Sequence, residues 1–196
     1  STVSQLPALR RLTVLPQVLA TAADFLDRPE NELVVGQGSF LVNTPGSSRL
    51  IYDWHNAKNE YPKRNNHINF WVPLIVNKTA TNGTLHVANG SHHRDYPFLE
   101  YRGPSSSMNT GALTQNRVPD EYVHQFETQA LVCPLGDAGA MLPRTLHTGS
   151  LNESNRCSYV MVFKVWANHE DWTLSSQLAV KYNSGDKGAG ADVRVV

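Results

Sequence analysis

The chain has 196 residues, of which 40% are hydrophobic and 17% are charged, and its formal net charge is zero. This length and composition are typical of a globular protein in water, and we expect a single domain over residues 1–196. No basic stripe favours nucleic-acid binding, no apolar run approaches the length of a membrane span, and no signal-peptide pattern opens the chain. We therefore expect a cytoplasmic protein that binds neither nucleic acid nor a membrane.

The first regular element predicted along the chain is a helix over residues 14–27, which read "VLPQVLATAADFLD". Apolar residues recur there at helical spacing, and Pro16 falls in the first turn, where proline is tolerated. The face predicted to be apolar comprises Val14, Val18, Leu19, Ala22, Phe25 and Leu26.

After this helix the pattern changes to short apolar or alternating runs, which clusters of Gly, Pro, Asn and Ser separate. The predicted strands read "LVVGQGSFLVN", "RLIYDW", "INFWVPLIV", "TLHVA", "FETQALVC", "AGAMLP" and "CSYVMVFKVW". This series predicts a mainly β, largely antiparallel domain with one or two flanking α-helices. A double-stranded jelly roll fits the number and spacing of the strands, and a generic sandwich fits the pattern nearly as well.

Two segments lack a clear period. The weak periodicity of residues 94–123 predicts a long loop. This loop could be a lid over a substrate or an ordinary solvated loop. Its basic and aromatic side chains would suit a small molecule with an anionic or polar group, and they are Arg94, Tyr96, Phe98, Tyr101, Arg102 and Arg117. The Gly-rich residues 185–196 predict a flexible tail.

Two of the eight histidines have distinctive surroundings. His55 lies in "YDWHNA", and His147 follows "GDAGAMLPRTL", a turn and then a short strand. Arg156 then precedes a hydrophobic strand, where a charged side chain is costly unless it has an anionic partner. Ser158 is two residues further on and would point to the same face, so the two side chains could hold one carboxylate. An internal salt bridge to a protein Asp or Glu explains Arg156 equally well.

Three segments in order resemble landmarks of the phytanoyl-CoA dioxygenase superfamily: "WHNAKNEYP…INFWVPL", "NGTLHVANGSHH" and "GDAGAMLPRTLHTGSLNESNRCS". Members of that superfamily are Fe(II)- and 2-oxoglutarate-dependent oxygenases on a double-stranded β-helix. The resemblance covers roughly residues 10–166. It implies that His55 and His147 bind iron, and that His92 corresponds to a common family histidine that is not a ligand.

The same resemblance assigns the co-substrate site. It implies that Arg156 binds the distal carboxylate of 2-oxoglutarate, with Ser158 as a helper, and that Tyr52 borders the co-substrate. Arg156 follows His147 at a shorter spacing than is usual in the family. Because side chains alternate along a strand, a hairpin shortened by two residues would keep Arg156 on the expected face.

One departure from the family pattern concerns the third iron ligand. The usual site has two histidines and one carboxylate, and the carboxylate position is occupied here by Ala57. Four interpretations remain open. The gap could hold chloride, as in the halogenase branch of the family. Asp53 or Glu60 could supply a carboxylate, water could fill the gap in an unusual hydroxylase, or the metal site could have decayed.

The resemblance thus predicts an enzyme that hydroxylates or halogenates an unactivated C–H bond of a small molecule. Its cofactors would be Fe(II) and 2-oxoglutarate, with chloride as a third if a halide fills the gap at Ala57. The alternative from a different class is a non-catalytic jelly-roll module that binds a small ligand. The sequence predicts neither the substrate nor the oligomeric state.

Overall fold

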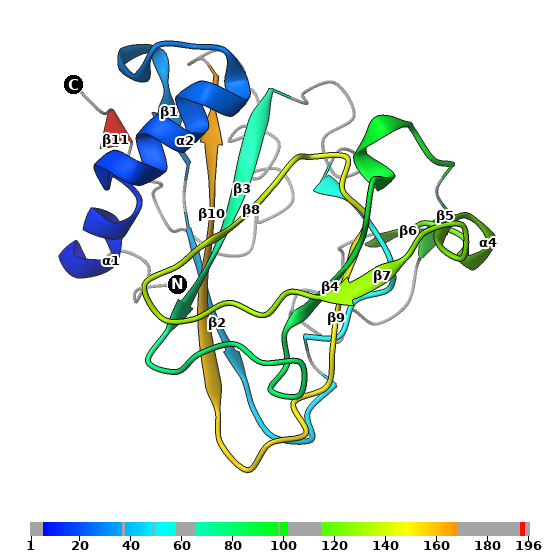
Figure 1. Ribbon diagram of the computed structural model, residues 1–196. Helices are drawn as coiled ribbons and strands as arrows, with labels where there is room; N and C mark the ends of the chain where they lie inside the picture. Colours follow the sequence, from blue (N-terminus) through cyan, green and yellow to red (C-terminus); the bar gives the residue numbers. More distant parts are fainter. Residues whose placement is uncertain are drawn as a thin grey trace.

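The computed structural model describes residues 6–36, 38–48, 50–57, 66–97, 99–101, 115–167 and 193–194. Most of the strands pair antiparallel in two main sheets, and helices pack on the outer side of the larger one (Figure 1). The prediction of a mainly β domain with flanking helices is therefore confirmed.

The larger sheet contains six strands in the described part of the chain, and its order is β11-β1-β10-β3-β8 with β2 also paired to β10. Its members are β1 (Val34–Val35), β2 (Ser39–Asn43), β3 (His67–Leu74), β8 (Gly139–Met141), β10 (Ser158–Trp166) and β11 (Val193–Arg194). β10 is central because it pairs with β3 along one edge and with β2 and β1 in succession along the other.

Side chains alternate along β10, so its two faces enter different cores. Met161, Phe163 and Val165 pack with Ile68 and Phe70 against the helices. Val160 and the partly buried Val162 lie on the opposite face, toward the smaller sheet.

The helices begin with α1 (Pro7–Leu12) and α2 (Pro16–Leu26), which the short 3-10 helix η2 (Glu30–Glu32) follows. α2 confirms the predicted helix, and it buries Val18, Leu19 and Ala22 against the larger sheet. Phe25 was predicted on the same face, but 56% of its surface is exposed in the last turn of α2. The sequence analysis did not predict α1.

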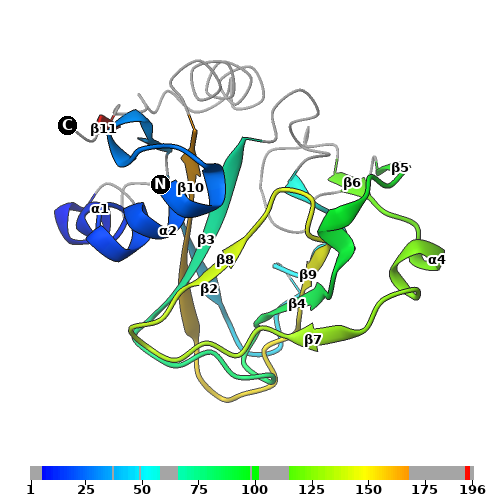
Figure 2. The ribbon, with the colours of Figure 1, turned by 45° about the horizontal axis from the view of Figure 1, so that its top comes forward.

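The smaller sheet has the order β7-β4-β9, formed by β7 (Thr128–Ala130), β4 (Leu85–Ala88) and β9 (His147–Gly149). A cluster of Trp71, Val87, Cys133, Met141 and Val160 fills the space between the two sheets. Figure 2 shows the two sheets on opposite sides of this interior. This is the two-sheet arrangement of a jelly roll.

The region predicted as a long loop contains regular structure. Its described parts form the hairpin of β5 (Leu99–Tyr101) and β6 (Gln115–Arg117) and the short helix α4 (Asp120–Val123). The 3-10 turn η3 (Ser91–His93) precedes them. The prediction of an irregular segment is therefore wrong for these parts, whereas Phe98 and residues 102–114 lie outside the described residues.

Two further predictions differ from the structure. The run "RLIYDW" forms no strand among its described residues, and His55 just after it makes an isolated bridge to His147. In the Gly-rich tail, β11 pairs with β1, and the rest of residues 185–196 lies outside the described residues. No helix in the described part of the chain is long and apolar enough to cross a membrane.

Gly149 allows the segment before His55 to approach β9 closely. A Cβ atom at position 149 would overlap the carbonyl oxygen of Leu50, which is backbone and has no alternative rotamer. We expect Gly149→Ala to destabilise the fold by about 1–3 kcal/mol, the usual cost of overpacking. Thermal denaturation should show this as a loss of roughly 3–10 °C in Tm.

Gly139→Ala is the matched control, because Gly139 also lies in a strand without a left-handed φ, and a Cβ atom there would meet the end of the flexible Leu131 side chain, at 2.7 Å. It should cost less stability than Gly149→Ala, because a side chain moves aside more easily than the backbone. A Gly149→Ala protein as stable as the wild type would show that the Leu50 segment moves freely, contrary to our expectation.

Candidate metal centre

The two histidines singled out in the sequence lie opposite each other in the structure. The His55 N–H donates to the His147 carbonyl at 3.1 Å, and the His147 N–H donates to the His55 carbonyl at 2.9 Å. Residues that exchange two backbone hydrogen bonds in this way carry their side chains on one face. The imidazole centroids are accordingly only 4.4 Å apart.

The face that carries both imidazoles points between the sheets. Val87 of β4 is the register partner of His147, so the two side chains lie on the same face of the smaller sheet. Val87 packs in the cluster with Trp71 and Val160 of the larger sheet. His55 and His147 therefore project toward the interior of the jelly roll.

Each imidazole is oriented by a backbone carbonyl two residues earlier. Nδ1 of His55 lies 2.6 Å from the Asp53 carbonyl oxygen, and Nδ1 of His147 lies 2.9 Å from that of Thr145. A carbonyl oxygen can only accept, so each Nδ1 carries the hydrogen and each Nε2 keeps its lone pair. Metal-binding histidines commonly have this arrangement, in which a hydrogen bond at one ring nitrogen fixes the other toward the metal.

The environment of His147 keeps it neutral. Burial, the nearby His55 and the more distant Lys164 lower the pKa of His147 to about 3, against the opposing hydrogen bond to Thr145. The neutral imidazole is the form that binds a metal ion. The pair thus fits a divalent cation in geometry, tautomer and charge.

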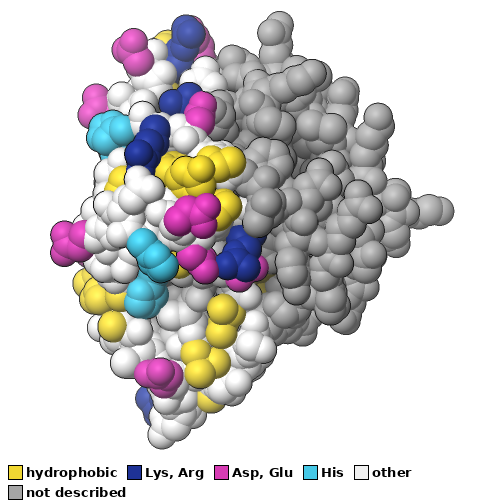
Figure 3. Space-filling view, turned by 90° about the vertical axis from the view of Figure 1, so that its right-hand side faces the viewer, with side chains coloured by type: hydrophobic (Ala, Val, Ile, Leu, Met, Phe, Trp, Pro, Cys, Tyr) yellow, Lys and Arg dark blue, Asp and Glu magenta, His cyan; other side chains and the backbone are white. Residues whose placement is uncertain are grey.

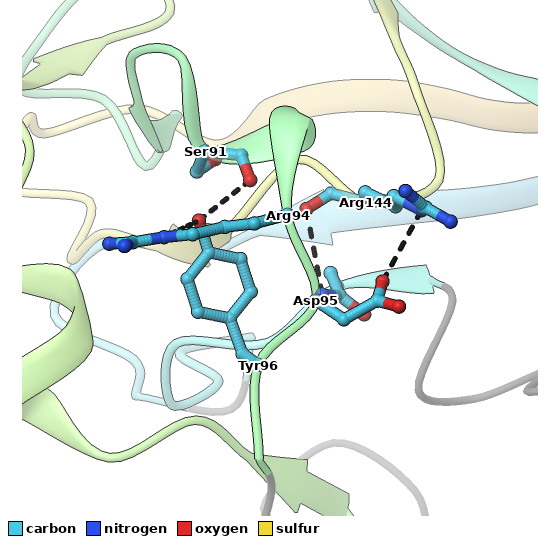
Figure 4. Close-up of polar contacts among 6 residues, drawn as sticks. Ser91, Arg94, Asp95, Tyr96 and Arg144 are labelled. Atoms are coloured by element: carbon cyan, nitrogen blue, oxygen red, sulfur yellow. Dashed lines mark hydrogen bonds and ion pairs between the residues drawn. The ribbon is translucent and has the colours of Figure 1, made fainter.

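The η3 turn and the segment after it contact the chain next to β9, and Figure 4 shows the Tyr96 hydroxyl directed at Ser91 and the ion pair of Arg144 with Asp95. Ser91 is fully buried, and its hydroxyl accepts the Leu146 N–H at 2.9 Å. The Tyr96 hydroxyl donates to the Ser91 carbonyl at 2.7 Å, which anchors the η3 turn. Ser91 was not among the residues predicted to matter, although it lies in "NGTLHVANGSHH", one of the three segments that carry the resemblance.

The His55 segment is attached to its neighbours at several backbone atoms. The Thr148 hydroxyl donates to the Tyr52 carbonyl, and the Val118 N–H donates to the Trp54 carbonyl at 2.7 Å. The Tyr52 ring lies beside His55, with the ring centroids 5.7 Å apart. Tyr52 therefore lies next to the metal-binding candidates, as its predicted position requires, and its contact with a co-substrate stays a prediction.

The structure supplies no third protein ligand in its described part. Groups of three or more His, Cys, Asp or Glu side chains placed to hold a metal ion are absent from the described residues. Asp53 is exposed, and it contacts His55 through its backbone carbonyl. Ala57 is 4% exposed, so its methyl group lies inside the protein, and Glu60 lies outside the described residues.

The two residues predicted to hold the co-substrate carboxylate are separated. β10 begins at Ser158, and Arg156 lies in the bend before it with its side chain exposed. The expected common face does not form, because the alternation of side chains applies only within the strand. Ser158 is buried, and its hydroxyl lies 2.6 Å from the ammonium group of Lys78, which the sequence analysis did not single out.

Comparison with solved structures supports the jelly-roll fold. EvdO2 from Micromonospora carbonacea var. aurantiaca, complexed with 2-oxoglutarate, matches 95% of this chain and 65% of its own, with a TM-score of 0.61 and 18% identity. EctD from S. alaskensis, with 2-oxoglutarate and 5-hydroxyectoine, matches 83% of this chain and 53% of its own, with a TM-score of 0.62 and 17% identity. The apo form of ThoJ, a non-heme monooxygenase, matches 81% of this chain and 54% of its own, with a TM-score of 0.58 and 18% identity.

At these identities the likeness establishes the fold, and the chain spans roughly half to two thirds of the length of these structures. No curated protein sequence matches the chain. The model of one protein family, phytanoyl-CoA dioxygenase (PhyH), matches residues 5–158, which include both central histidines. The chain therefore belongs to the phytanoyl-CoA dioxygenase family.

Proposed function

We propose that this protein is a non-haem Fe(II)- and 2-oxoglutarate-dependent oxygenase that acts on an unactivated C–H bond of a small molecule. The observation that carries the proposal is the His55–His147 pair, with both rings on one face and both Nδ1 atoms held by carbonyls. Membership of the phytanoyl-CoA dioxygenase family supports the choice of iron and 2-oxoglutarate.

The residues of the chain would bind the metal ion and hold its ligands in the required orientation. His55 and His147 would bind Fe(II) through Nε2, while the Asp53 and Thr145 carbonyls keep the rings from turning. The apolar cluster between the sheets would exclude water from one side of the site. Iron and 2-oxoglutarate, when bound, supply the oxidising power that amino-acid side chains lack.

Ala57 decides which group the enzyme would transfer. A methyl group cannot bind a metal, so two histidines and 2-oxoglutarate would leave one further coordination position, besides the one that dioxygen needs, to a water molecule or a chloride ion. Chloride there would make halogenation possible, and water would favour hydroxylation. Glu60 is the remaining candidate for a protein carboxylate.

The face around α4 includes Arg94 and Arg117, two of the basic side chains that the sequence suggested for an anionic substrate. Basic and acidic side chains are interspersed on this face (Figure 3). The Arg94 guanidinium lies over the Tyr96 and Phe126 rings, and Arg117 pairs with Asp120 at 2.8 Å. Both arginines thus have partners within the protein, so we propose a small-molecule substrate without assigning it a charge.

The histidine pair can be tested by metal-dependent stability. At a free Fe(II) concentration of about 100 times Kd, binding should stabilise the native state by roughly 2.7 kcal/mol. This corresponds to a rise of about 5–10 °C in Tm under anaerobic conditions. We expect His55→Ala and His147→Ala each to abolish this rise, because each leaves a single imidazole.

His124→Ala serves as the control, because His124 is exposed and lies outside the pair. It should keep the full metal-dependent rise in Tm. If the wild type showed no rise with Fe(II), alone or with 2-oxoglutarate, the oxygenase proposal would fail and a non-catalytic small-ligand module would replace it.

A second experiment tests the gap at Ala57. We expect Ala57→Asp to tighten Fe(II) binding at least about tenfold, because it adds a carboxylate ligand. If chloride occupies the gap in the wild type, chloride should shift the visible charge-transfer band of the Fe(II)–2-oxoglutarate complex, and Ala57→Asp should abolish the shift. Ala57→Gly keeps the gap and should respond as the wild type does. A wild-type band that is insensitive to chloride would contradict the halide interpretation.

A further inference from the structure

Lys78 is a charged side chain that lies entirely inside the protein, with 0% of its surface exposed. It follows β3, and its backbone exchanges two hydrogen bonds with Cys133, at 2.8 and 3.0 Å. These bonds fix the main chain so that the side chain enters the fold. The ammonium group lies 5.4 Å from the centroid of the Trp71 ring, and Trp71 belongs to the cluster between the sheets.

The ammonium group of Lys78 has three hydrogen-bond acceptors, but it has no negatively charged partner among the described residues. Its ammonium group contacts the Ser158 hydroxyl at 2.6 Å, the Gly83 carbonyl at 2.8 Å and the Asn82 carbonyl at 3.2 Å. All three acceptors are neutral. No carboxylate in the described part of the chain pairs with Lys78, and burial alone lowers the pKa of its ammonium group to about 8.

A buried charge without a counter-ion is expensive, and proteins usually pair it. A neutral donor could make hydrogen bonds to the carbonyls of Asn82 and Gly83 without this cost. A charged ammonium group at this position is therefore better explained if it binds an anion than if its role is purely structural. Such an anion could take the place of the Asn82 carbonyl, which accepts hydrogen bonds from the ammonium group at 3.2 Å and from the Ser158 hydroxyl at 2.5 Å.

The residue that contacts Lys78 lies on the side of the larger sheet that faces the metal-binding candidates. This residue, Ser158, lies on the face of β10 that also carries Val160, and Val160 packs with Val87. Val87 in turn shares its face with His147. Lys164, which is partly buried, also lies on this face of β10, and its charge contributes to the lowered pKa of His147.

Arg156 is badly placed for the role that the resemblance gave it. Its side chain is exposed, and its backbone carbonyl is fixed in the bend by the Asn152 side-chain amide at 2.8 Å and the Ser154 hydroxyl at 3.0 Å. We propose that Lys78, assisted by Ser158, binds the distal carboxylate of 2-oxoglutarate in place of Arg156. This inference rests on the proposed function, because it assigns a role within the same site.

The test compares two keto acids that differ only at the distal end. 2-Oxoglutarate and 2-oxopentanoate have the same metal-chelating group, but 2-oxopentanoate carries a methyl group in place of the distal carboxylate. Binding of each to the anaerobic Fe(II) protein is followed by the charge-transfer band, which does not depend on turnover. We expect the wild type to prefer 2-oxoglutarate by about 100-fold, the scale of a buried charge pair.

Lys78→Met should reduce this preference to about threefold or less, because it removes the partner of the distal carboxylate alone. Ser158→Ala should reduce it about tenfold, the worth of one charge-assisted hydrogen bond, and it keeps the test available if Lys78→Met does not fold. Arg156→Met, which removes an exposed cation of similar length, should keep the wild-type preference. Thermal denaturation without ligands would report the purely structural effect of each substitution.

The opposite pattern would overturn the inference. A lost preference in Arg156→Met with an unchanged preference in Lys78→Met or Ser158→Ala would return the role to Arg156. Equal weakening of both keto acids in the Lys78 and Ser158 variants would show that these residues only support the fold. A wild type that binds Fe(II) but neither keto acid would reject the co-substrate itself, and the oxygenase proposal and this inference would then fail together.

Discussion

The candidate site depends on two backbone hydrogen bonds between His55 and His147. They join the segment before β3 to β9 at the edge of the smaller sheet, and they set the two rings side by side with their centroids 4.4 Å apart. The absence of a side chain at Gly149 lets the chain at Leu50 lie against β9. The Thr148 hydroxyl adds a further bond to the Tyr52 carbonyl. The position of His55 is thus determined largely by contacts between its own segment and β9, the strand that carries His147.

The contacts of Leu146, the residue before His147, also stabilise the bridge between His55 and His147. The Leu146 N–H donates to Ser91, and the Leu146 carbonyl accepts the N–H of Ala88. Leu146 also packs in a cluster with Ala88, Tyr96, Val118 and Val123. Tyr96, Val118 and the helix α4 therefore support the position of His147. A region that could be read as a lid also has a structural function here.

Much of the fold could be predicted because it depends on local patterns. The strands at residues 67–74 and 158–166 are apolar runs with β-branched and aromatic residues, and both exist as predicted. The run "RLIYDW" has the same composition but forms no strand among its described residues, because its segment meets β9 through isolated contacts. The pairing of His55 with His147 was expected from the family resemblance, since spacing alone cannot bring residues 92 positions apart together.

The parts that could not be predicted depend on where a strand begins and on which turns are buried. Arg156 and Ser158 would share a face if the strand included both, but β10 begins at Ser158. Lys78 lies in the polar run "NKTATNG", which is typical of a solvated turn. Its burial follows from backbone bonds to Cys133, a residue 55 positions away, and no local pattern contains that information.

The charges of the proposed site can be counted, and the count bears on Ala57. Fe(II) contributes two positive charges and Lys78 one, while the two histidines are neutral and 2-oxoglutarate contributes two negative charges. With Lys164 left out of the count, because it has a further interaction of its own, one positive charge then remains in an interior where uncompensated charge is costly. A carboxylate at position 57 would cancel it, but the methyl group of Ala57 cannot. One monovalent anion at the vacant coordination position would restore neutrality, whereas a water molecule would not. In the site that we propose, this count would favour a bound halide over water next to Ala57, unless Glu60 provided the missing charge.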